Sequence, residues 1–362
     1  NPKGIMHTHR SGLSFAEWAA DEYGLRPEDR LSNHAPLHFD LSTFDFFAGA
    51  VAGATTVIIP EALTKFPASL SKLMADERIS VWYSVPFALI QLMQHGVLAS
   101  RDLSALRWLL FAGEVFPTKH LRELMQMLPG VRFSNLYGPT ETNVCTYYHV
   151  PEPPQGDETI PIGRACANVE DLVLDADDQP VLPGEVGELV IRTDLPWQMN
   201  HGYSGNPEAT AAAWRNGWFH TGDAFRVDDQ GNWFFVDRFK DSIRRRGENV
   251  SSFEVEAEIC AHPAVREAAV VAVPAADSED EILVALSLAE GASLDPAALI
   301  EFLRPRMAHF MIPRYVRMLA DLPKTPTNKV EKYLIRKAGV TADTWDREAA
   351  GIVVKRDKIG QF

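Results

Sequence analysis

Between residues 55 and 138 the chain alternates short apolar runs with segments of helical periodicity. The apolar runs and the helical segments follow one another along the sequence at 55–60, 66–78, 79–85, 86–96, 106–113, 118–130 and 131–138. Strands that are apolar along their whole length and separated by helices are typical of a parallel sheet covered on both faces. The alternation therefore predicts an α/β fold built on a parallel sheet.

The sequence after residue 168 predicts different architecture. Residues 169–193 alternate apolar and polar positions around a turn at 182–187, which is typical of a β subdomain made of hairpins. A second turn, at 227–232, separates two more strands. The first part of the chain is thus expected to hold a parallel α/β sheet and a β subdomain.

A small α+β unit is predicted at the C-terminal end. Ser251 and Glu254 have the spacing of a capping box that opens a helix. Strands and one further helix are expected after it, at 264–275, 281–289, 295–307 and 315–323. The charged segment 237–248 lacks periodicity and is interpreted as a link. We therefore expect a core domain over residues 1–239 and a C-terminal domain over residues 240–362.

Composition excludes several classes of function. The formal net charge of −14 argues against nucleic-acid binding as a main task, because nucleic-acid binders usually present a basic face. Cys145, Cys166 and Cys260 are widely separated and form no CxxC pair, which suits a reducing compartment and favours a cytoplasmic protein without zinc. The sequence contains no run of eighteen or more uncharged apolar residues, so no membrane-spanning helix is predicted. The first residues are typical of an interior segment, so we expect chain upstream of them.

Three stretches follow directly after predicted strands. They are rich in small residues and in side-chain donors and acceptors, and lie at 83–86, 112–114 and 137–141. In open α/β sheets, ligands bind in the crevice beyond the carboxyl ends of the strands. These stretches are expected to line a ligand crevice.

Five motifs in order resemble the adenylate-forming superfamily, which includes adenylation domains of nonribosomal peptide synthesis, acyl-CoA synthetases and luciferases. The motifs are "NLYGPTE", "GEVGELVIR", "HTGD", "DRFKDSIRRRGENVSSFEVE" and "LPKTPTNKVEK", and "NPKG" resembles the end of a phosphate loop. Each could occur by chance, but the five together cover almost the whole chain. The resemblance implies ATP and Mg²⁺ as cofactors and formation of an acyl adenylate.

The resemblance also implies roles for single residues. Catalysis would use Lys329 between the substrate carboxylate and the nucleotide, Thr140 at the α-phosphate and Glu141 as the Mg²⁺ ligand. The substrate carboxylate and the phosphates of the nucleotide are both anions, so their charge must be neutralised where they meet. Mg²⁺ suits this task and prefers oxygen ligands. The nucleotide-binding positions would be Lys3, Gly113, Glu114, Tyr137, Gly138, Asp223 and Arg238. By themselves most of these residues suit a structural role, and only their joint occurrence favours the site.

Members of this superfamily rotate the C-terminal domain between adenylation and thioester formation. The resemblance places the hinge at Lys240 and brings Gly247 to the thiolation channel. One departure concerns Asn328, which stands where the family commonly has Gly before the lysine; Asn tolerates positive φ better than most residues. The basic run 244–246 is expected to be a solvent-exposed face, with docking of carrier or CoA phosphate as the alternative.

The substrate is expected to be an amino acid. In amino-acid-activating relatives an Asp at the position of Asp40 binds the α-ammonium group, and an unpaired buried carboxylate would penalise a neutral acid. The alternative is that Asp40 caps a turn with Ser42. The other pocket positions implied by the motifs are Leu41, Phe44, Tyr83, Leu110, Ala112, Leu136, Val144 and Cys145.

This almost wholly apolar lining resembles that of L-prolyl carrier-protein ligases, so we expect L-proline as substrate and a separate phosphopantetheinylated carrier protein as acceptor. Apolar pockets discriminate weakly, which leaves valine, alanine or a cyclic analogue open. Alternatives are a ligase of the carnitine/crotonobetaine-CoA type with CoA as acceptor, a luciferase-like oxygenase, or a silent binding protein. Cys145 as a nucleophile is a further alternative, but no base is indicated beside it.

Overall fold

The chain forms two compact units. The computed structural model describes residues 3–156, 158–193, 198–239, 243–245, 248–275, 280–325 and 330–354. The first unit comprises Asn1–Thr221 and Phe225–Phe235, and the second comprises Gly222–Ala224 and Val236–Phe362. The domain boundary at Lys240 stays a prediction, and that residue lies outside the described ones.

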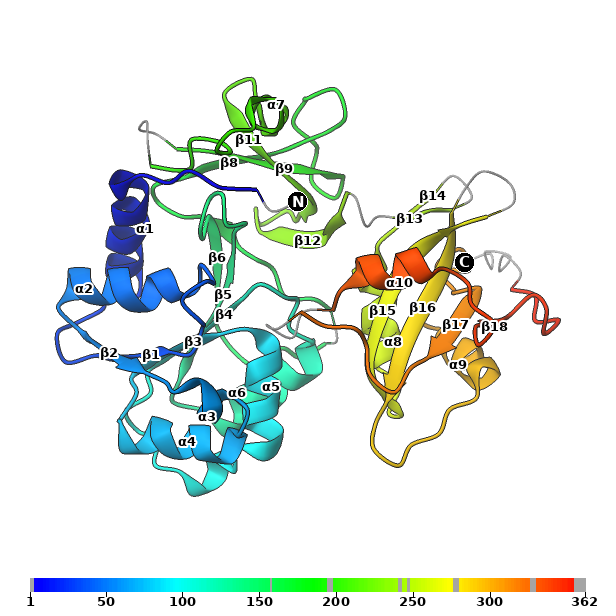
Figure 1. Ribbon diagram of the computed structural model, residues 1–362, viewed down its shortest axis with the longest axis horizontal. Coiled ribbons are helices and arrows are strands. Elements are labelled where there is room, and N and C mark those ends of the chain that lie inside the picture. The colour runs from blue at the N-terminus through cyan, green and yellow to red at the C-terminus, as the bar shows by residue number, and fades with distance from the viewer. Residues whose placement is uncertain are drawn as a thin grey trace. The chain divides into compact units, whose positions relative to one another are not determined.

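The first unit contains a seven-stranded sheet and most of the helices (Figure 1). Its helices are α1 (His9–Glu22), α2 (Gly49–Ala52), α3 (Glu61–Thr64), α4 (Pro67–Asp76), α5 (Pro86–His95), α6 (Thr118–Met127) and α7 (Pro207–Ala213), with a π-helical turn η1 (Phe44–Ala48) and a 3-10 turn η2 (Leu98–Ser100). The strands of this sheet are β1 (Arg30–Asn33), β2 (Thr55–Ile58), β3 (Val81–Ser84), β4 (Trp108–Ala112), β5 (Arg132–Tyr137), β6 (Thr146–Val150) and β7 (Arg164–Ala165).

The predicted parallel sheet is confirmed. Its strand order is β2-β1-β3-β4-β5-β6-β7, and neighbours from β2 to β5 run parallel, whereas β6 and β7 are antiparallel additions. Each strand and helix expected between residues 55 and 137 is present. Strand β1 and helix α1 were not predicted, and β1 separates β2 from β3.

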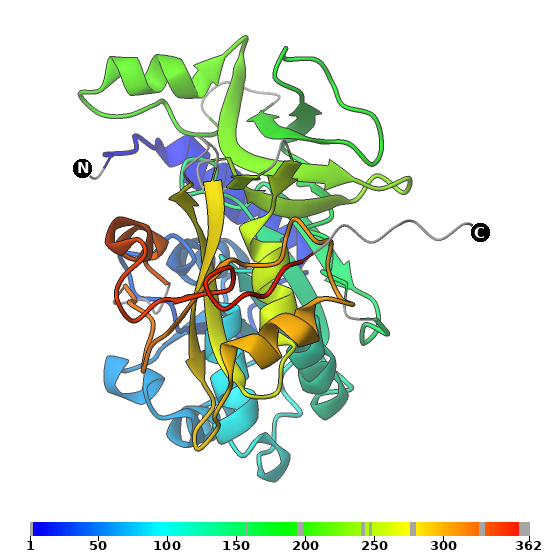
Figure 2. The ribbon, with the colours of Figure 1, turned by 90° about the vertical axis from the view of Figure 1, so that its right-hand side faces the viewer.

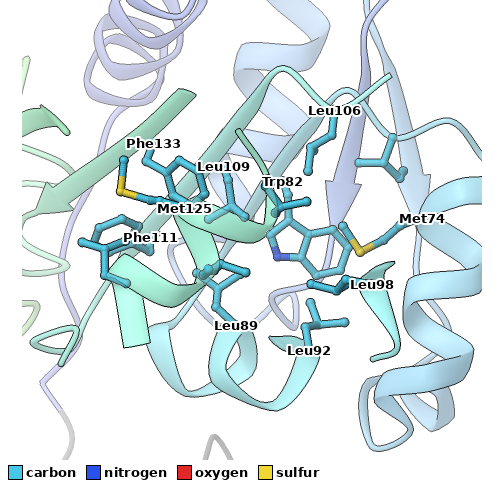
Figure 3. Packing of buried hydrophobic residues seen from close by; sticks show 14 of the residues in the cluster. Met74, Trp82, Leu89, Leu92, Leu98, Leu106, Leu109, Phe111, Met125 and Phe133 are labelled. Atoms are coloured by element: carbon cyan, nitrogen blue, oxygen red, sulfur yellow. The ribbon is translucent and has the colours of Figure 1, made fainter. Parts of the chain in front are cut away.

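Strand alternation divides the core of the first unit into two layers. On β4, Leu109 and Phe111 face a layer that contains Trp82 and the inner sides of α4, α5 and α6 (Figure 3). Its neighbours Leu110 and Ala112 face the opposite layer, which α1 and η1 cover. Because successive residues of a strand point to opposite faces, one short strand supplies both layers. The expected covering of both sheet faces is confirmed.

A second, antiparallel sheet confirms the predicted β subdomain. Its strands are β8 (Glu170–Leu174), β9 (Val186–Arg192), β10 (Trp214–Arg215), β11 (Trp218–Val227) and β12 (Trp233–Arg238). The turn at 182–187 joins β8 to β9, which pair antiparallel, and the turn at 227–232 joins β11 to β12.

The second unit is an α+β sandwich, as predicted (Figure 2). Its elements are β13 (Ile243–Arg245), β14 (Glu248–Val250), α8 (Ser252–Cys260), β15 (Val265–Pro274), β16 (Asp280–Leu288), α9 (Pro296–Leu303), β17 (Tyr315–Met318), α10 (Lys332–Ala338) and β18 (Trp345–Asp346). Side chains of α8 and α9 pack on one face of the β15-β16-β17-β18 sheet, and Ile335 of α10 packs on the other (Figure 1). The predicted N-cap is present, because the Ser251 hydroxyl accepts a hydrogen bond from the Glu254 amide.

Two expectations about the segment 237–248 were wrong. Its described part is not an irregular link, because β13 pairs with β14 in an antiparallel hairpin. Nor is Arg245 on a solvent-exposed face: its side chain is 1% exposed and lies 2.8 Å from the Glu281 carboxylate. It also donates to the carbonyl oxygens of Phe310 and Ile312. Partners distant in sequence thus bury a charge that the local pattern assigned to solvent.

Within the described residues, none of the helices combines the length and the apolar character needed to cross a membrane.

Candidate functional site

The loop after β5 doubles back tightly on itself. The Cys145 amide donates to the Tyr137 carbonyl oxygen at 2.9 Å, and the Thr142 amide donates to the Pro139 carbonyl oxygen at 2.9 Å. A Cβ atom on Gly138 would lie 1.7 Å from the Asn143 carbonyl oxygen, so this position requires glycine. The loop brings its two ends together, with the predicted nucleotide and metal residues on one limb and the predicted pocket residues on the other.

The predicted pocket residues converge on one face of the parallel sheet. Seven of them belong to a single cluster of buried side chains: Leu41, Phe44, Tyr83, Leu110, Ala112, Leu136 and Val144. The rings of Phe44 and Tyr83 meet edge to face, with centroids 5.4 Å apart. Three neighbouring strands contribute to this wall because every second residue of each strand points to the same face. The structure therefore brings together residues up to about one hundred positions apart in sequence.

Two cysteines lie in or beside this cluster. Cys166 belongs to the same cluster and was missed by the sequence analysis, since no local pattern marks it. Cys145 is fully buried and packs in an adjacent cluster with Phe225. Its sulfur lies 3.6 Å from the Tyr137 carbonyl oxygen. Complete burial argues against Cys145 as a nucleophile, because attack requires access to the substrate.

The turn η1 presents two consecutive buried side chains. Phe44 is fully buried and Asp45 is 1% exposed. Burial raises the pKa of the Asp45 carboxyl well above its usual range, and the Asn33 side chain offsets part of this effect. π-Helical turns are frequent at functional sites, which makes η1 a feature that the sequence analysis missed.

Asp40 lies immediately before this turn and is partly buried. Its backbone oxygen accepts hydrogen bonds from the amide and the hydroxyl of Thr43, at 2.9 and 2.6 Å. Among the described residues its carboxylate has no hydrogen-bond or ion-pair partner. Ser42 instead donates its hydroxyl to the Phe39 carbonyl oxygen. The carboxylate does not cap this turn.

The negative charge of Asp40 influences Tyr83 in the buried apolar cluster. Burial raises the pKa of Tyr83 well above its usual value, and the negative charges of Asp40 and Asp45 raise it further. Asn143 of the β5 loop donates to the hydroxyl of Thr43 at 2.9 Å. This bond ties the loop to the turn that carries Asp40.

Glu141 is held by residues that the sequence analysis did not identify. The Tyr203 hydroxyl donates to Glu141 Oε1 at 2.7 Å, and the Asn200 amide group donates to the Glu141 backbone oxygen at 2.8 Å. Burial and the Glu141 carboxylate raise the pKa of Tyr203, so it remains a hydrogen-bond donor. The Lys3 ammonium lies 4.5 Å from the centre of the Tyr203 ring. Lys3, Tyr203 and Glu141 therefore form one group.

Other predicted nucleotide residues occupy loop and strand ends of the first unit. His7 Nε2 lies 3.0 Å from the exposed Thr140 carbonyl oxygen. The Tyr137 ring packs against Phe225, with centroids 5.0 Å apart. Gly113 follows β4 with a φ of 87°, a conformation that favours glycine, and Glu114 comes next.

Asp223 and Arg238 form an ion pair in the second unit. Arg238 Nε lies 3.5 Å from Asp223 Oδ1, and the two side chains are 51% and 9% exposed. A nearly buried carboxylate beside a half-exposed guanidinium presents a fixed acceptor and a movable donor. Both were predicted from motifs.

Four residues of the prediction lie outside the described ones: Lys240, Gly247, Asn328 and Lys329. Arg246 of the basic run lies outside them as well. Their roles stay predictions.

Comparison with known proteins supports the motif analysis. The model of the AMP-binding enzyme family matches residues 1–204, and that of the AMP-binding enzyme C-terminal domain matches residues 254–329. An L-proline–[L-prolyl-carrier protein] ligase of Pseudomonas fluorescens is 37% identical over 93% of this chain and 66% of its own length. A protein of the same description from Streptomyces coelicolor is 35% identical over 94% of this chain and 64% of its own length.

A solved structure is also similar to this chain. The amide bond synthetase McbA from Marinactinospora thermotolerans superposes with a TM-score of 0.85 at 29% identity, over 93% of this chain and 66% of that one. The chain thus spans a little less than two thirds of the length of the relatives that it matches. On the family match over more than half of its residues, the chain belongs to the AMP-binding enzyme family.

Proposed function

We propose that this protein is an ATP-dependent ligase that activates an amino acid, L-proline above others, as an aminoacyl adenylate. The activated prolyl group then passes to the phosphopantetheine thiol of a separate carrier protein. The observation that carries this proposal is the Asp40 carboxylate, which has no hydrogen-bond or ion-pair partner among the described residues and stands beside a cluster of apolar side chains. The names of the two curated relatives support the same substrate.

The chemistry of the pocket fits a small apolar amino acid. A carboxylate without a partner favours a ligand that brings a positive charge, because a desolvated charge is stabilised by a close opposite charge. The α-ammonium group of an amino acid supplies that charge. The surrounding wall of Phe44, Tyr83, Leu110 and Val144 offers no partner for a second charge, so the side chain should be apolar.

The group formed by Lys3, Tyr203 and Glu141 suits a metal–triphosphate complex. Glu141 Oε1 accepts a hydrogen bond from Tyr203, and no hydrogen bond occupies Oε2 among the described residues. One carboxylate oxygen together with substrate phosphates is a common way to hold Mg²⁺. Bound there, Mg²⁺ would neutralise phosphate charge. Glu141 would hold the ion, and Lys3 would attract the triphosphate.

The nucleotide and the acyl transfer would use the remaining motif residues. Tyr137 would stack on adenine, Asp223 would accept the ribose hydroxyls, and Thr140 would contact the α-phosphate. Lys329 would bridge the attacking carboxylate and the nucleotide. The domain rotation about Lys240 and the approach of Gly247 to the thiol belong to the same proposal.

The test is ATP–pyrophosphate exchange across a panel of amino acids, with Asp40→Asn beside the wild type. We expect exchange to be strongest with L-proline and to fall at least about 30-fold in the variant, as for loss of a buried charge pair. Asp21→Asn, on the exposed side of α1, is the matched control and should retain exchange. Equal exchange in Asp40→Asn and wild type would overturn the role of Asp40.

A second assay identifies the acceptor. Thiolation is measured with a holo-carrier protein and with free CoA after adenylation has been established. Transfer to the carrier alone supports the proposal, whereas transfer to CoA with carnitine-like or fatty acids as substrates would favour the acyl-CoA ligase alternative. Absence of exchange with every acid would favour a silent member of the family, and ATP-dependent oxygen uptake would favour an oxygenase.

A further inference from the structure

The segment that carries Lys329 is closed at its base by backbone hydrogen bonding. Lys324 and Val330 form an antiparallel β-bridge. The Glu331 amide also donates to the Pro323 carbonyl oxygen at 2.8 Å. Residues 323–324 and 330–331 therefore lie side by side, and we refer to them as the base of the lysine loop.

Lys332, directly after this base, is anchored in a nearly buried polar site on α8. Its ammonium lies 2.7 Å from Glu256 Oε1 and donates to the Ser252 hydroxyl at 2.8 Å. It also lies 4.2 Å from the centre of the Phe253 ring. The Lys332 and Glu256 side chains are only 15% and 12% exposed. Every partner is fixed on one helix, so the ammonium has a defined position.

Glu256 connects this anchor to the central sheet. Its Oε1 accepts a hydrogen bond from the Val270 amide of β15 at 2.6 Å. On the other side of the base, Lys324 pairs with Glu267, which also lies on β15. Their side chains are 20% and 21% exposed. A lysine–acid pair thus holds one side of the base to β15, and a second such pair holds the residue after the base to α8.

The same network reaches the strand that precedes the predicted hinge. The Ser252 amide donates to Asp237 Oδ2, and the Ser251 hydroxyl donates to the Val236 carbonyl oxygen, both at 2.5 Å. Val236 and Asp237 lie near the end of strand β12, which ends at Arg238. The first turn of α8 therefore contacts both the end of β12 and the anchor of the lysine loop.

We propose that Lys332 and Lys324 are positioning residues, which hold the base of the lysine loop so that Lys329 is presented in the adenylation step. This inference rests on the proposed function. A nearly buried ion pair is often no more stable than an apolar pair of similar size, so stability alone does not account for two such pairs flanking one loop. The need for a fixed geometry accounts for the two pairs, because a small misplacement of a catalytic group lowers the rate by a large factor.

The experiment compares the two half-reactions in Lys332→Met, Lys332→Arg and the wild type. We expect Lys332→Met to lower proline-dependent exchange about 10- to 100-fold through kcat. Transfer from pre-formed prolyl adenylate to the holo-carrier should stay within about twofold, because Lys329 acts in adenylation. Lys332→Arg should recover most of the exchange. A parallel loss of both half-reactions in Lys332→Met would overturn the proposal.

Glu258→Gln is the matched control. Glu258 lies on the same helix and pairs with Arg306 at 2.7 Å, but this pair does not touch the base of the lysine loop. Exchange in Glu258→Gln should equal that of the wild type. A loss equal to that in Lys332→Met would mean that any ion pair of α8 matters equally, and would overturn the specific role of Lys332.

Amide hydrogen exchange tests the anchor without any enzymatic activity. The Glu331 amide should exchange faster in Lys332→Met than in the wild type or Glu258→Gln, while the core amides of β16 stay protected. Unchanged protection at Glu331 would overturn the proposal. If the wild type activates no amino acid, the proposed function fails. Hydrogen exchange of the Glu331 amide still tests whether Lys332 anchors the base of the lysine loop.

A double variant separates positioning from folding. Lys332→Met alone leaves Glu256 without its cation, so this variant can lose structure. Lys332→Met combined with Glu256→Gln removes both charges and should restore protection of the β16 amides. Low exchange of pyrophosphate in this folded variant supports positioning, and full recovery of the wild-type rate would overturn it.

Discussion

The apolar cluster that forms the proposed pocket of the first unit and the base of the lysine loop in the second are built from different kinds of contact. The pocket wall consists of side chains such as Leu110 and Tyr83 that alternate along strands and are almost completely buried. The loop base depends on lysine–acid pairs that are nearly buried and come from separate elements. Shape therefore dominates in the pocket, and charge pairing dominates at the loop base. Substitutions should consequently act through volume in the first region and through position and pH in the second.

Gly138→Ala is expected to have the largest effect, because it acts on the loop that joins the pocket to the nucleotide residues. The added Cβ would meet the Asn143 carbonyl oxygen, which belongs to the backbone and cannot turn away. We expect a loss of about 3 kcal/mol in the free energy of unfolding. Proline-dependent exchange should fall about 100-fold or more. Thermal unfolding and exchange assays measure the two quantities.

Gly130→Ala is the control for this change. Gly130 follows α6, and a Cβ there would have no heavy atom within 4 Å. This variant should resemble the wild type in both assays. Near-normal exchange in Gly138→Ala would show that the loop adapts, and would contradict the tight closure between its two limbs.

Phe44→Ala and Phe47→Ala sharpen the comparison within a single turn. Both residues lie on η1, but Phe44 is fully buried and Phe47 is 51% exposed. Removing the buried ring should cost about 3–5 kcal/mol of unfolding free energy. It should also enlarge the pocket and favour bulkier apolar amino acids by about tenfold relative to proline. Chemical denaturation and the amino-acid panel test both expectations.

Phe47→Ala should change the unfolding free energy by less than about 0.5 kcal/mol, since it removes an exposed side chain. Equal effects of the two substitutions would mean that η1, and not the pocket wall, determines the outcome. An unchanged amino-acid preference in Phe44→Ala would remove Phe44 from the proposed pocket.

Sequence analysis predicted these two regions unequally, for a physical reason. The resemblance to a known family implied the pocket residues. Four of them, Tyr83, Leu110, Ala112 and Leu136, lie on strands, whose period of two residues assigns each side chain to a face. The partners of Lys332 cannot be found in this way, because Ser252 lies 80 positions away and neither residue is part of a shared repeat. The prediction for Arg245 was wrong for the same reason. A basic run is typical of a solvent-exposed face, and its local sequence does not show that Glu281 pairs with Arg245.

Residues that hold other functional residues were also beyond the sequence. Tyr203 positions Glu141 from 62 positions away, and no local pattern distinguishes it from a tyrosine of the core. Asp40 was found because a motif contains it, but only the structure shows that its carboxylate has no hydrogen-bond partner among the described residues. Motifs therefore indicate the residues of the proposed site better than the residues that support them.

Glu256→Gln tests the charged region with the smallest expected effect, through the pH dependence of stability. Burial raises the pKa of Glu256 from 4.5 to about 7, although Lys332 lowers it. The folded protein therefore binds a proton more tightly here than the unfolded chain. Its contribution to stability is complete below pH 4.5 and is lost as the pH rises through about 7. The loss should be about 3 kcal/mol for the second unit, because each unit of pKa difference corresponds to about 1.4 kcal/mol.

Glu256→Gln has no carboxyl at position 256, so its free energy of unfolding should fall less than that of the wild type between pH 5 and pH 8. Other titratable groups of the region, Lys332, Asp237, Cys260 and Glu267, remain in both proteins, and the difference between them isolates Glu256. Hydrogen exchange of the β15 core amides measures the free energy of the second unit. Glu258→Gln should follow the wild type at both pH values. Parallel pH profiles of Glu256→Gln and wild type would show that the carboxylate at the anchor is charged throughout this range, and the loop base would then be held by a permanent ion pair.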